Sequence, residues 1–260
     1  TYAGQVLSYR PKSESNDLLF VSEKAYYEDG KAIKGGVPVC WPWFGADPED
    51  RGRPAHGFVR NRQWELSATE SLADGSTRVV MSLSDTDETR AIWPNSFKLS
   101  LEIIVGETLK LALVTENTSD QSVNISQAFH TYFYVGDISK VQVLGLDGNH
   151  YLDKVDGSAQ KTQAGPVIID AEVDRIYTDL DGELAIDDKS LDRKIRIASR
   201  GCSTAVVWNP WADIAASMGD LNDDDYKKML CVETANAGPE TVTIAPGESY
   251  RLEAEYTIES

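Results

Sequence analysis

The clearest structural signal in this chain is LSLEIIVGETLKLALVTEN, Leu99–Asn117. Hydrophobic and polar residues alternate in both halves of this stretch, and Val105-Gly106-Glu107 marks a turn between them. An alternation with a period of two puts successive side chains on opposite faces, which is typical of a half-buried β-strand. Two such strands joined by a short turn that contains glycine predict an antiparallel hairpin.

Segments of the same kind continue on both sides of this hairpin. They are Thr77–Ser84, Ser122–Phe129, Lys140–Leu146, Ser203–Asn209, Thr241–Pro246 and Ser249–Ile258. Helical signals are few: only Asp87–Ile92 and Asp223–Met229, which both begin with acidic residues, could each form about two turns. Short strands joined by turns favour antiparallel sheets packed face to face. We therefore expect an all-β fold, a large antiparallel β-sandwich with a few short helices, in which residues 1–260 form a single domain.

The composition is that of a globular protein with a marked excess of acids. Of 260 residues, 41% are hydrophobic, and the formal net charge is −17. Such a charge disfavours nucleic acid and anionic membranes as partners. The sequence shows no signal peptide and no apolar run of the roughly 18 residues that a membrane span requires. We expect a cytoplasmic protein that binds a small molecule, and we take a monomer as the simplest oligomeric state.

The three cysteines, Cys40, Cys202 and Cys231, are widely spaced and form no CxxC pair. This spacing indicates neither a zinc site nor a disulfide framework, so buried free thiols in a reducing compartment are the preferred interpretation. The chain also contains no HExxH, no nucleophile elbow GxSxG, no P-loop and no dinucleotide-binding GxGxxG. We therefore expect no metal and no cofactor.

The most unusual irregular segment is GGVPVCWPWFGADPEDRGRPAHGFVRNR, Gly35–Arg62. Its large apolar side chains are Trp41, Trp43, Phe44 and Phe58. Between positions 31 and 62, six Lys or Arg residues stand against three acids, a net charge of +3 in a strongly acidic chain. Aromatic rings of this size are rarely left in water without a reason. The segment is therefore interpreted as the wall of a pocket for a small anion with an apolar face, such as a phosphorylated sugar.

Two residues are the leading candidates for acid–base chemistry. His130 ends a predicted strand and is followed by the aromatic run Tyr132–Tyr134, which could shield it from water and stack against a sugar ring. A half-buried histidine bonded to the backbone is the alternative. Glu233 lies in the apolar run MLCVETANA. A carboxylate in such surroundings needs either an oppositely charged partner or a functional role. Its alternative is a salt bridge across the sheet.

Two further residues are candidates for contact with substrate. Asp174 lies in AEVDRIYTDL, and its alternative is a local turn or an ion pair with Arg175. His56 lies in RPAHGFVRN, inside the Gly35–Arg62 segment, and could equally donate a hydrogen bond that stabilises the loop or bind a sugar hydroxyl. Together with the basic residues of that segment, these groups form a minimal acid–base set with an anion anchor.

Six motifs, taken in order, connect these candidates to a known family. They are GGVPVCWPWFG, HGFVRN, FHTYFYVGDI, VDRIY, WNPW…SMGD and CVETANA. They resemble the bacterial hexose-6-phosphate mutarotases, or glucose-6-phosphate 1-epimerases, which are relatives of aldose 1-epimerase with a galactose-mutarotase-like supersandwich. The resemblance runs from near Gly4 to about Ser260, and it implies one or two further strands before Thr1.

The resemblance also implies a role for each matching residue. His130 would be the general acid on the ring oxygen, and Glu233 the base on the anomeric hydroxyl. Asp174 would bind sugar hydroxyls, and Arg60 would hold the phosphate with its guanidinium fork. The family usually has arginine where this chain has Lys34. Lysine keeps the charge without the fork, so the resemblance implies that Lys34 also contacts the phosphate. Relatives often have glutamine at the position of Ala55, and any hydrogen bond from that glutamine is lost here.

The implied reaction is the interconversion of the α and β anomers of an aldohexose 6-phosphate, without a cofactor. The net charge of −17 would favour a protonated His130, although screening limits this effect. Two other functions stay open at this point. One is an aldose 1-epimerase that acts on unphosphorylated sugars. The other is a non-catalytic carbohydrate-binding protein in which His130 and Glu233 only bind hydroxyl groups.

Overall fold

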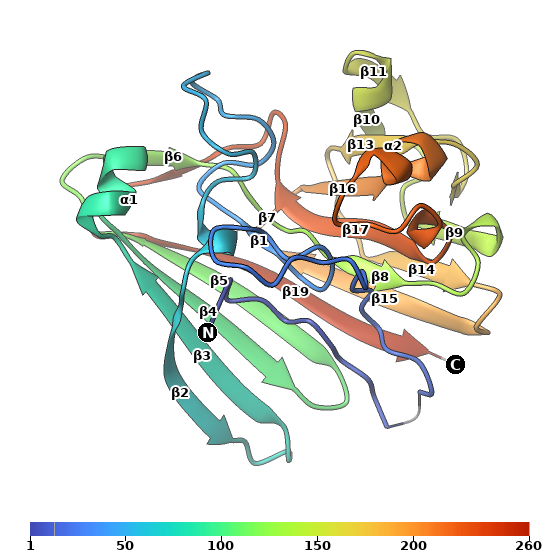
Figure 1. The fold of residues 1–260 in the computed structure, drawn as a ribbon, viewed down its shortest axis with the longest axis horizontal. Coiled ribbons are helices and arrows are strands. Elements are labelled where there is room, and N and C mark those ends of the chain that lie inside the picture. The colour runs from blue at the N-terminus through green and yellow to red at the C-terminus, as the bar shows by residue number, and fades with distance from the viewer. Residues whose placement is uncertain (13, 260) are drawn as a thin grey trace.

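The protein, described here from a computed structural model covering residues 1–12 and 14–259, consists mainly of antiparallel β-strands (Figure 1). Within these residues the strands form one nine-stranded sheet, one eight-stranded sheet and one two-stranded sheet. The strands of the two-stranded sheet are β6 (Val123–Ile125) and β18 (Val242–Ile244). The predicted all-β antiparallel fold is confirmed.

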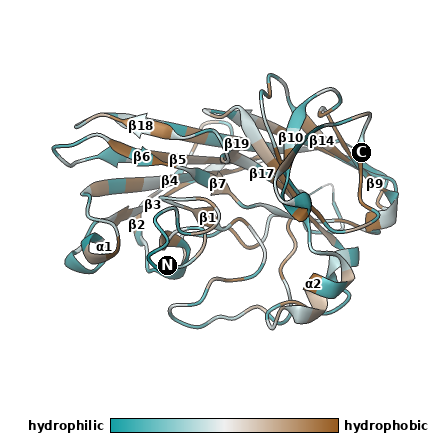
Figure 2. Cartoon of the chain, turned by 90° about the horizontal axis from the view of Figure 1, so that it is seen from above, coloured by the Kyte–Doolittle hydropathy of each residue, from teal (hydrophilic) through white to brown (hydrophobic). Residues whose placement is uncertain are grey.

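The nine-stranded sheet contains the hairpin from which the sequence analysis began. In spatial order its strands are β12 (Val167–Ile168), β9 (Val141–Leu144), β14 (Leu184–Asp188), β15 (Arg193–Arg200), β19 (Ser249–Glu259), β5 (Leu109–Asn117), β4 (Phe97–Val105), β3 (Thr77–Ser84) and β2 (Glu65–Ser71). The hairpin pairs Phe97 with Asn117 and Val105 with Leu109. Hydrophobic and hydrophilic residues alternate along β4 (Figure 2), and the hydrophobic ones are buried because they face the second sheet.

The eight-stranded sheet is built around a completely buried strand. Its strands are β1 (Val39–Cys40), β7 (Gln127–Phe129), β17 (Met229–Asn236), β16 (Thr204–Asn209), β13 (Val173–Tyr177), β10 (His150–Asp153) and β11 (Ala159–Thr162), with β8 (Tyr132–Tyr134) also paired to β17. Leu230 and Val232 of β17 join the large core that contains residues of both sheets. Because side chains alternate along a strand, Cys231 and Glu233 point to the opposite face.

The Gly35–Arg62 segment is anchored in the core by its tryptophans, which corrects part of its interpretation as a pocket wall. Trp41 is fully buried, its ring lies 4.5 Å from that of Phe97, and its indole Nε1 donates a hydrogen bond of 3.1 Å to Thr115 Oγ1. Gly57 is required beside it, because a Cβ there would lie 1.8 Å from the Trp41 carbonyl oxygen. Trp41, Trp43 and Phe58 are therefore structural, and only Phe44 of the four aromatics stays partly exposed.

One of the two helices predicted from the sequence is confirmed. Helix α1 (Asp87–Ile92) has the predicted bounds, and Thr86 caps it. The predicted helix Asp223–Met229 is wrong: only the 3-10 turn η4 (Asp225–Lys227) forms, because Met229 already begins β17. Helix α2 (Trp211–Ser217) was not predicted. The remaining 3-10 turns are η1 (Val59–Asn61), η2 (Ile138–Lys140) and η3 (Lys154–Asp156).

One predicted strand is divided between two sheets. The segment Ser122–Phe129 forms β6 and β7, and Ser126 lies between them. The Ser126 N–H donates to the Pro42 carbonyl oxygen (3.1 Å), and its Oγ accepts from the Phe44 N–H (2.9 Å). These bonds to the Gly35–Arg62 segment replace sheet pairing at that point. In the described residues, every helix is too short for a hydrophobic crossing of a bilayer.

Candidate active site

One face of the eight-stranded sheet brings four chemically distinctive side chains into a row. Asp174 lies opposite Trp208, Trp208 opposite Cys231, and Cys231 opposite Tyr132. Directly paired residues of antiparallel strands project from the same face, so the row crosses β13, β16, β17 and β8. Glu233 follows Cys231 by two residues and therefore stands beside this row. The sequence places these residues far apart, and sheet register alone assembles them.

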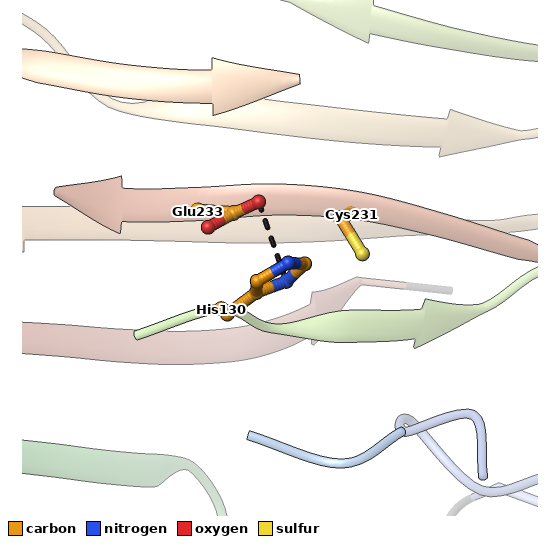
Figure 3. A group of neighbouring side chains, drawn as sticks. All are labelled: His130, Cys231 and Glu233. Carbon is orange, nitrogen blue, oxygen red and sulfur yellow. Dashed lines mark ion pairs between the residues drawn. The ribbon is translucent and has the colours of Figure 1, made fainter. Parts of the chain in front are cut away.

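His130 lies between β7 and β8 and faces Glu233 (Figure 3). Its backbone N–H donates to the Pro38 carbonyl oxygen at 2.9 Å, so the Gly35–Arg62 segment fixes its position. Its ring Nδ1 lies 3.3 Å from Glu233 Oε1, and the two residues are only 8% and 1% exposed. The structure therefore brings together the two residues predicted for acid–base chemistry. A salt bridge of Glu233 to Lys or Arg, the alternative, is not formed by the described residues.

Both members of the His130–Glu233 pair have a buried polar atom without a hydrogen-bond partner in the described residues. The atoms are His130 Nδ1, whose approach to Glu233 lacks hydrogen-bond geometry, and Glu233 Oε2. A buried polar atom left unpaired costs about 1–3 kcal/mol. Two such atoms on adjacent side chains are consistent with a site whose hydrogen bonds are completed by a ligand.

Aromatic rings hold the His130 imidazole in place. The Tyr132 ring is stacked almost parallel to it at 4.8 Å and 8°, and the Trp208 ring meets it edge-on at 5.9 Å. The aromatic run after His130 was expected to shield it, and Tyr132 does so. Phe133 instead points into the shared core against Tyr256, with ring centroids 5.3 Å apart. The alternation of β8 explains this division.

Burial pushes both members of the pair toward their uncharged forms. The pKa of His130 lies well below its ordinary range because of burial and of the nearby His56, Arg60 and Lys34. The pKa of Glu233 lies well above its ordinary range because of burial and the neighbouring Asp174. The expectation that the acidic chain keeps His130 protonated is wrong, because desolvation and nearby cations outweigh distant, screened acids.

His56 stabilises its own loop, although as an acceptor and not as the expected donor. Its Nδ1 accepts a hydrogen bond from the Gly45 N–H at 3.3 Å, and burial lowers the pKa of His56 to about 3. Its ring centroid lies 5.5 Å from that of His130. A neutral ring at this distance can also contact a sugar, and that role stays a prediction.

The two predicted phosphate ligands differ in how their charge is compensated. Arg60 donates to the Ala55 carbonyl oxygen at 3.1 Å and forms no ion pair with the described residues. Lys34 Nζ lies 3.6 Å from Asp220 Oδ1, and these side chains are 17% and 22% exposed. Both cations lower the pKa of His130, so both lie near the His130–Glu233 pair. Arg60 is therefore the cation more available to an anion.

Asp174 is free of the ion pair that the sequence allowed. It lies on the face of the His130–Glu233 pair, whereas Arg175 points to the other face and donates to Gln163 Oε1 at 3.3 Å. Burial raises the pKa of Asp174 above its ordinary value. Its carboxyl group is thus a partly desolvated acceptor near Glu233, suited to hydroxyl groups.

Sequence reasoning missed three residues of this site: Trp208, Asp220 and Cys231. The ligand atoms of Cys231, His130 and Glu233 all lie within 4.8 Å of one another, close enough to hold a metal ion. Burial raises the pKa of the Cys231 thiol well above its usual range. The available signal was the spacing of Cys231 and Glu233, two positions apart on a strand and hence on one face. Trp208 and Asp220 lie in the motif WNPW…SMGD, which supported the family resemblance but was given no role for either residue.

Comparison with known proteins finds relatives that match most of the chain. The family model "Aldose 1-epimerase" matches residues 1–257. A protein of Cenchrus ciliaris named "Putative glucose-6-phosphate 1-epimerase" is 36% identical over 96% of this chain and 77% of its own length. A protein of Escherichia coli with the same name is 39% identical over 89% of this chain and 76% of its own length.

A solved structure extends the agreement to the fold. The crystal structure of a "putative mutarotase" from Salmonella typhimurium is similar with a TM-score of 0.92 and 32% identity, covering 99% of this chain and 85% of that one. The galactose-mutarotase-like fold and the isomerase class expected from the sequence are confirmed. With a family match over nearly its whole length, the chain belongs to the aldose 1-epimerase family.

Proposed function

We propose that this protein interconverts the α and β anomers of an aldohexose 6-phosphate, with glucose 6-phosphate as the first substrate to test. The observation that carries the proposal is the buried His130–Glu233 pair, with 3.3 Å between Nδ1 and Oε1. Acid–base ring opening needs one group to take a proton and another to give one. A protein that only binds sugar does not need a buried acid–base pair such as His130 and Glu233.

The reaction begins with opening of the sugar ring. Glu233 takes the proton from the anomeric O1–H, while His130 gives a proton to the ring oxygen O5. The C1–O5 bond breaks and its electron pair stays on O5, so that C1 becomes the carbonyl carbon of an open-chain aldehyde. Rotation about C1–C2 then presents the other face of the carbonyl group. The two residues reverse their roles and the ring closes as the other anomer.

Burial sets the proton inventory of the pair. Since desolvation disfavours a net charge, the pair shares one titratable proton and is neutral overall whichever residue carries it. Burial favours this proton on Glu233, so ring opening proceeds from the form in which the proton has passed to His130 and Glu233 is ionised. Each ring opening takes one proton from O1 and returns one to O5, so this inventory is unchanged. No electrons leave the sugar and no group is transferred, so the chemistry itself requires no cofactor.

The neighbouring cations support a phosphorylated substrate. Arg60 has a guanidinium group with no acidic partner among the described residues, and its planar fork suits phosphate oxygens. Lys34 adds a second charge at the same site. The names of the relatives from Cenchrus ciliaris and Escherichia coli specify glucose 6-phosphate. A sugar phosphate as the small-molecule partner also agrees with the prediction of a cytoplasmic enzyme.

The remaining site residues would orient the sugar. Asp174 would accept hydrogen bonds from sugar hydroxyls, and His56 would contact the sugar from the loop. Trp208 lies between Asp174 and Cys231 in the row and is only partly buried. Its ring offers an apolar surface for one face of the pyranose.

Magnetisation-transfer NMR tests the proposal directly. The exchange rate between the anomers is measured for glucose 6-phosphate, glucose and galactose, with the enzyme and without it. We expect acceleration for the phosphate ester. Acceleration of free sugars alone would reassign the enzyme to unphosphorylated aldoses. Sugar binding without any acceleration would refute catalysis and leave a carbohydrate-binding protein.

A further inference from the structure

A third side chain shares the space of the His130–Glu233 pair without a part in acid–base chemistry. Cys231 and Glu233 leave the same face of β17, and both point toward the His130 ring (Figure 3). A buried thiol could simply fill space, as most buried cysteines do. Its ligand atom, however, lies within 4.8 Å of those of His130 and Glu233.

These distances approach those of a tetrahedral metal centre. Zinc–ligand bonds of 2.0–2.3 Å at tetrahedral angles separate neighbouring donor atoms by about 3.3–3.6 Å. His130 Nδ1 and Glu233 Oε1 are already 3.3 Å apart. The widest separation in the cluster, at most 4.8 Å, must shrink by up to about 1.2–1.5 Å. Binding therefore requires rotation of side chains in the cluster.

The His130 and Glu233 atoms that would bind the metal ion are not occupied by hydrogen bonds. His130 Nδ1 and Glu233 Oε2 are buried and have no hydrogen-bond partner in the described residues. His130 and Glu233 are 8% and 1% exposed, so bulk water has little access to their polar atoms and competes little with a metal ion for them. Metal-ligand atoms that have no hydrogen-bond partner and lie in a rigid, desolvated position lose little entropy when a cation binds. The cluster therefore offers three buried ligands, two of which already have the spacing of a metal centre.

Thiol, imidazole and carboxylate together suit one class of cation. Sulfur and nitrogen ligands favour Zn²⁺ and similar borderline ions, whereas Mg²⁺ and Ca²⁺ prefer oxygen alone. A thiolate and a carboxylate supply two negative charges, which balance a divalent ion although Lys34 and Arg60 lie nearby. The protons displaced from the ligands pass to solvent.

We propose that His130, Cys231 and Glu233 form a binding site for a thiophilic divalent cation of the Zn²⁺ class, and that this cation inhibits the enzyme. A bound ion would occupy the imidazole and the carboxylate that ring opening uses, so inhibition is competitive with substrate. The inhibition rests on the proposed function, whereas the binding site does not. The test is therefore designed to separate the two.

Binding is tested with Co²⁺ as a spectroscopic probe of the chelator-treated protein. We expect a thiolate-to-Co²⁺ charge-transfer band in the near ultraviolet, which Cys231→Ser removes. Cys40→Ser and Cys202→Ser are matched controls, because these thiols lie outside the cluster and should leave the band in place. Glucose 6-phosphate in excess should displace the ion and abolish the band. Absence of the band in the parent protein, or its persistence in Cys231→Ser, would overturn the site.

Inhibition is tested by Zn²⁺ titration of anomer exchange, with each rate normalised to the metal-free rate of the same variant. Loss of one of three ligands should raise the inhibition constant of Cys231→Ser at least tenfold, roughly the minimum cost of disturbing a metal site. Equal inhibition of both proteins, or activity that disappears on chelation, would refute the proposal. A thiolate–Co²⁺ band in a protein without epimerase activity would support the site and refute the function.

Discussion

The two large sheets of this protein use burial for different purposes. In the nine-stranded sheet, strand β4 buries apolar side chains on one face and leaves polar ones partly exposed on the other. There Glu102 pairs with Arg251 at 2.8 Å and with Arg78. In the eight-stranded sheet, β17 is buried on both faces and its second face holds Glu233. One sheet therefore contributes mainly to stability, while the other accepts unfavourable buried polar groups in exchange for chemistry.

The largest expected effect follows from removing the acid or the base. His130→Asn and Glu233→Gln should each lower the anomer exchange rate by about 10²–10⁴-fold, the usual contribution of general acid–base catalysis. The melting temperature should stay unchanged or rise, because each change removes a buried ionisable group with an unpaired atom. NMR exchange and thermal unfolding measure the two quantities. A large fall in stability would mean that the pair is structural.

A substitution one residue away in β17 is the matched control. Thr234 follows Glu233 but points to the opposite face, where its Oγ1 lies 2.7 Å from Ser199 Oγ. Thr234→Val keeps the shape of the side chain but removes this hydrogen bond, which should lower the free energy of unfolding by about 1 kcal/mol. The exchange rate per folded molecule should not change. Loss of activity in this variant would show that the two faces of β17 are not independent.

The second effect belongs to the nine-stranded sheet. Leu113 in β5 is fully buried in the core between the two sheets. Leu113→Ala should lower the free energy of unfolding by about 2–5 kcal/mol, through lost apolar burial and a cavity. The KM and the rate per folded molecule should stay at parent values. Urea unfolding with parallel kinetics checks this, and a selective loss of rate would contradict the division between the sheets.

The third effect concerns only the recognition of phosphate. Arg60→Ala should raise the KM for glucose 6-phosphate about tenfold or more, the equivalent of a charge-assisted hydrogen bond of about 1.5–3 kcal/mol. The KM for free glucose should change little. Arg62→Ala is the control, because Arg62 forms an ion pair with Glu88, with 2.9 Å between Nη1 and Oε1. An equal effect of Arg60→Ala on both sugars would remove the phosphate from the proposal.

The same division explains how much the sequence could predict. In the hairpin, β5 has the expected bounds and β4 begins two residues earlier than expected, at Phe97. This agreement is close because the alternation of polar and apolar residues is a local property. Strand β2 was missed because all its residues are exposed and its sequence has no apolar period. Strands β10 and β11 were missed for a related reason, since both are short and partly exposed.

Only some residues of the candidate site were predicted, and their assembly was not. His130 and Glu233 were noticed as polar groups in apolar surroundings, and the family resemblance supplied their roles. Their proximity depends on the pairing of β17 with β7 and β8, which no local pattern encodes. Trp208 and Cys231 enter the site for the same reason. Asp220 enters it through a loop contact with Lys34.

The smallest expected effect lies in the Gly35–Arg62 segment, which contacts both sheets. Asp47 accepts hydrogen bonds from the Arg53 side chain and from the N–H groups of Glu49 and Arg51. The Arg53 side chain lowers the pKa of Asp47 below its ordinary value of 3.8. A lowered pKa means that the stabilisation is complete above the ordinary value and is lost as the pH falls toward the folded-state pKa.

Below about pH 4 this segment should therefore loosen before the sheets do. Hydrogen-exchange protection of the Glu49 and Arg51 amides should fall, while protection of Leu113 in β5 stays constant. Asp47→Asn should produce the same selective loss at neutral pH, with a modest rise in KM because His56 and Arg60 belong to the same segment. Equal loss of protection in β5 would mean that the segment is part of the stabilising core. Its attachment through Trp41 would then outweigh its role at the site.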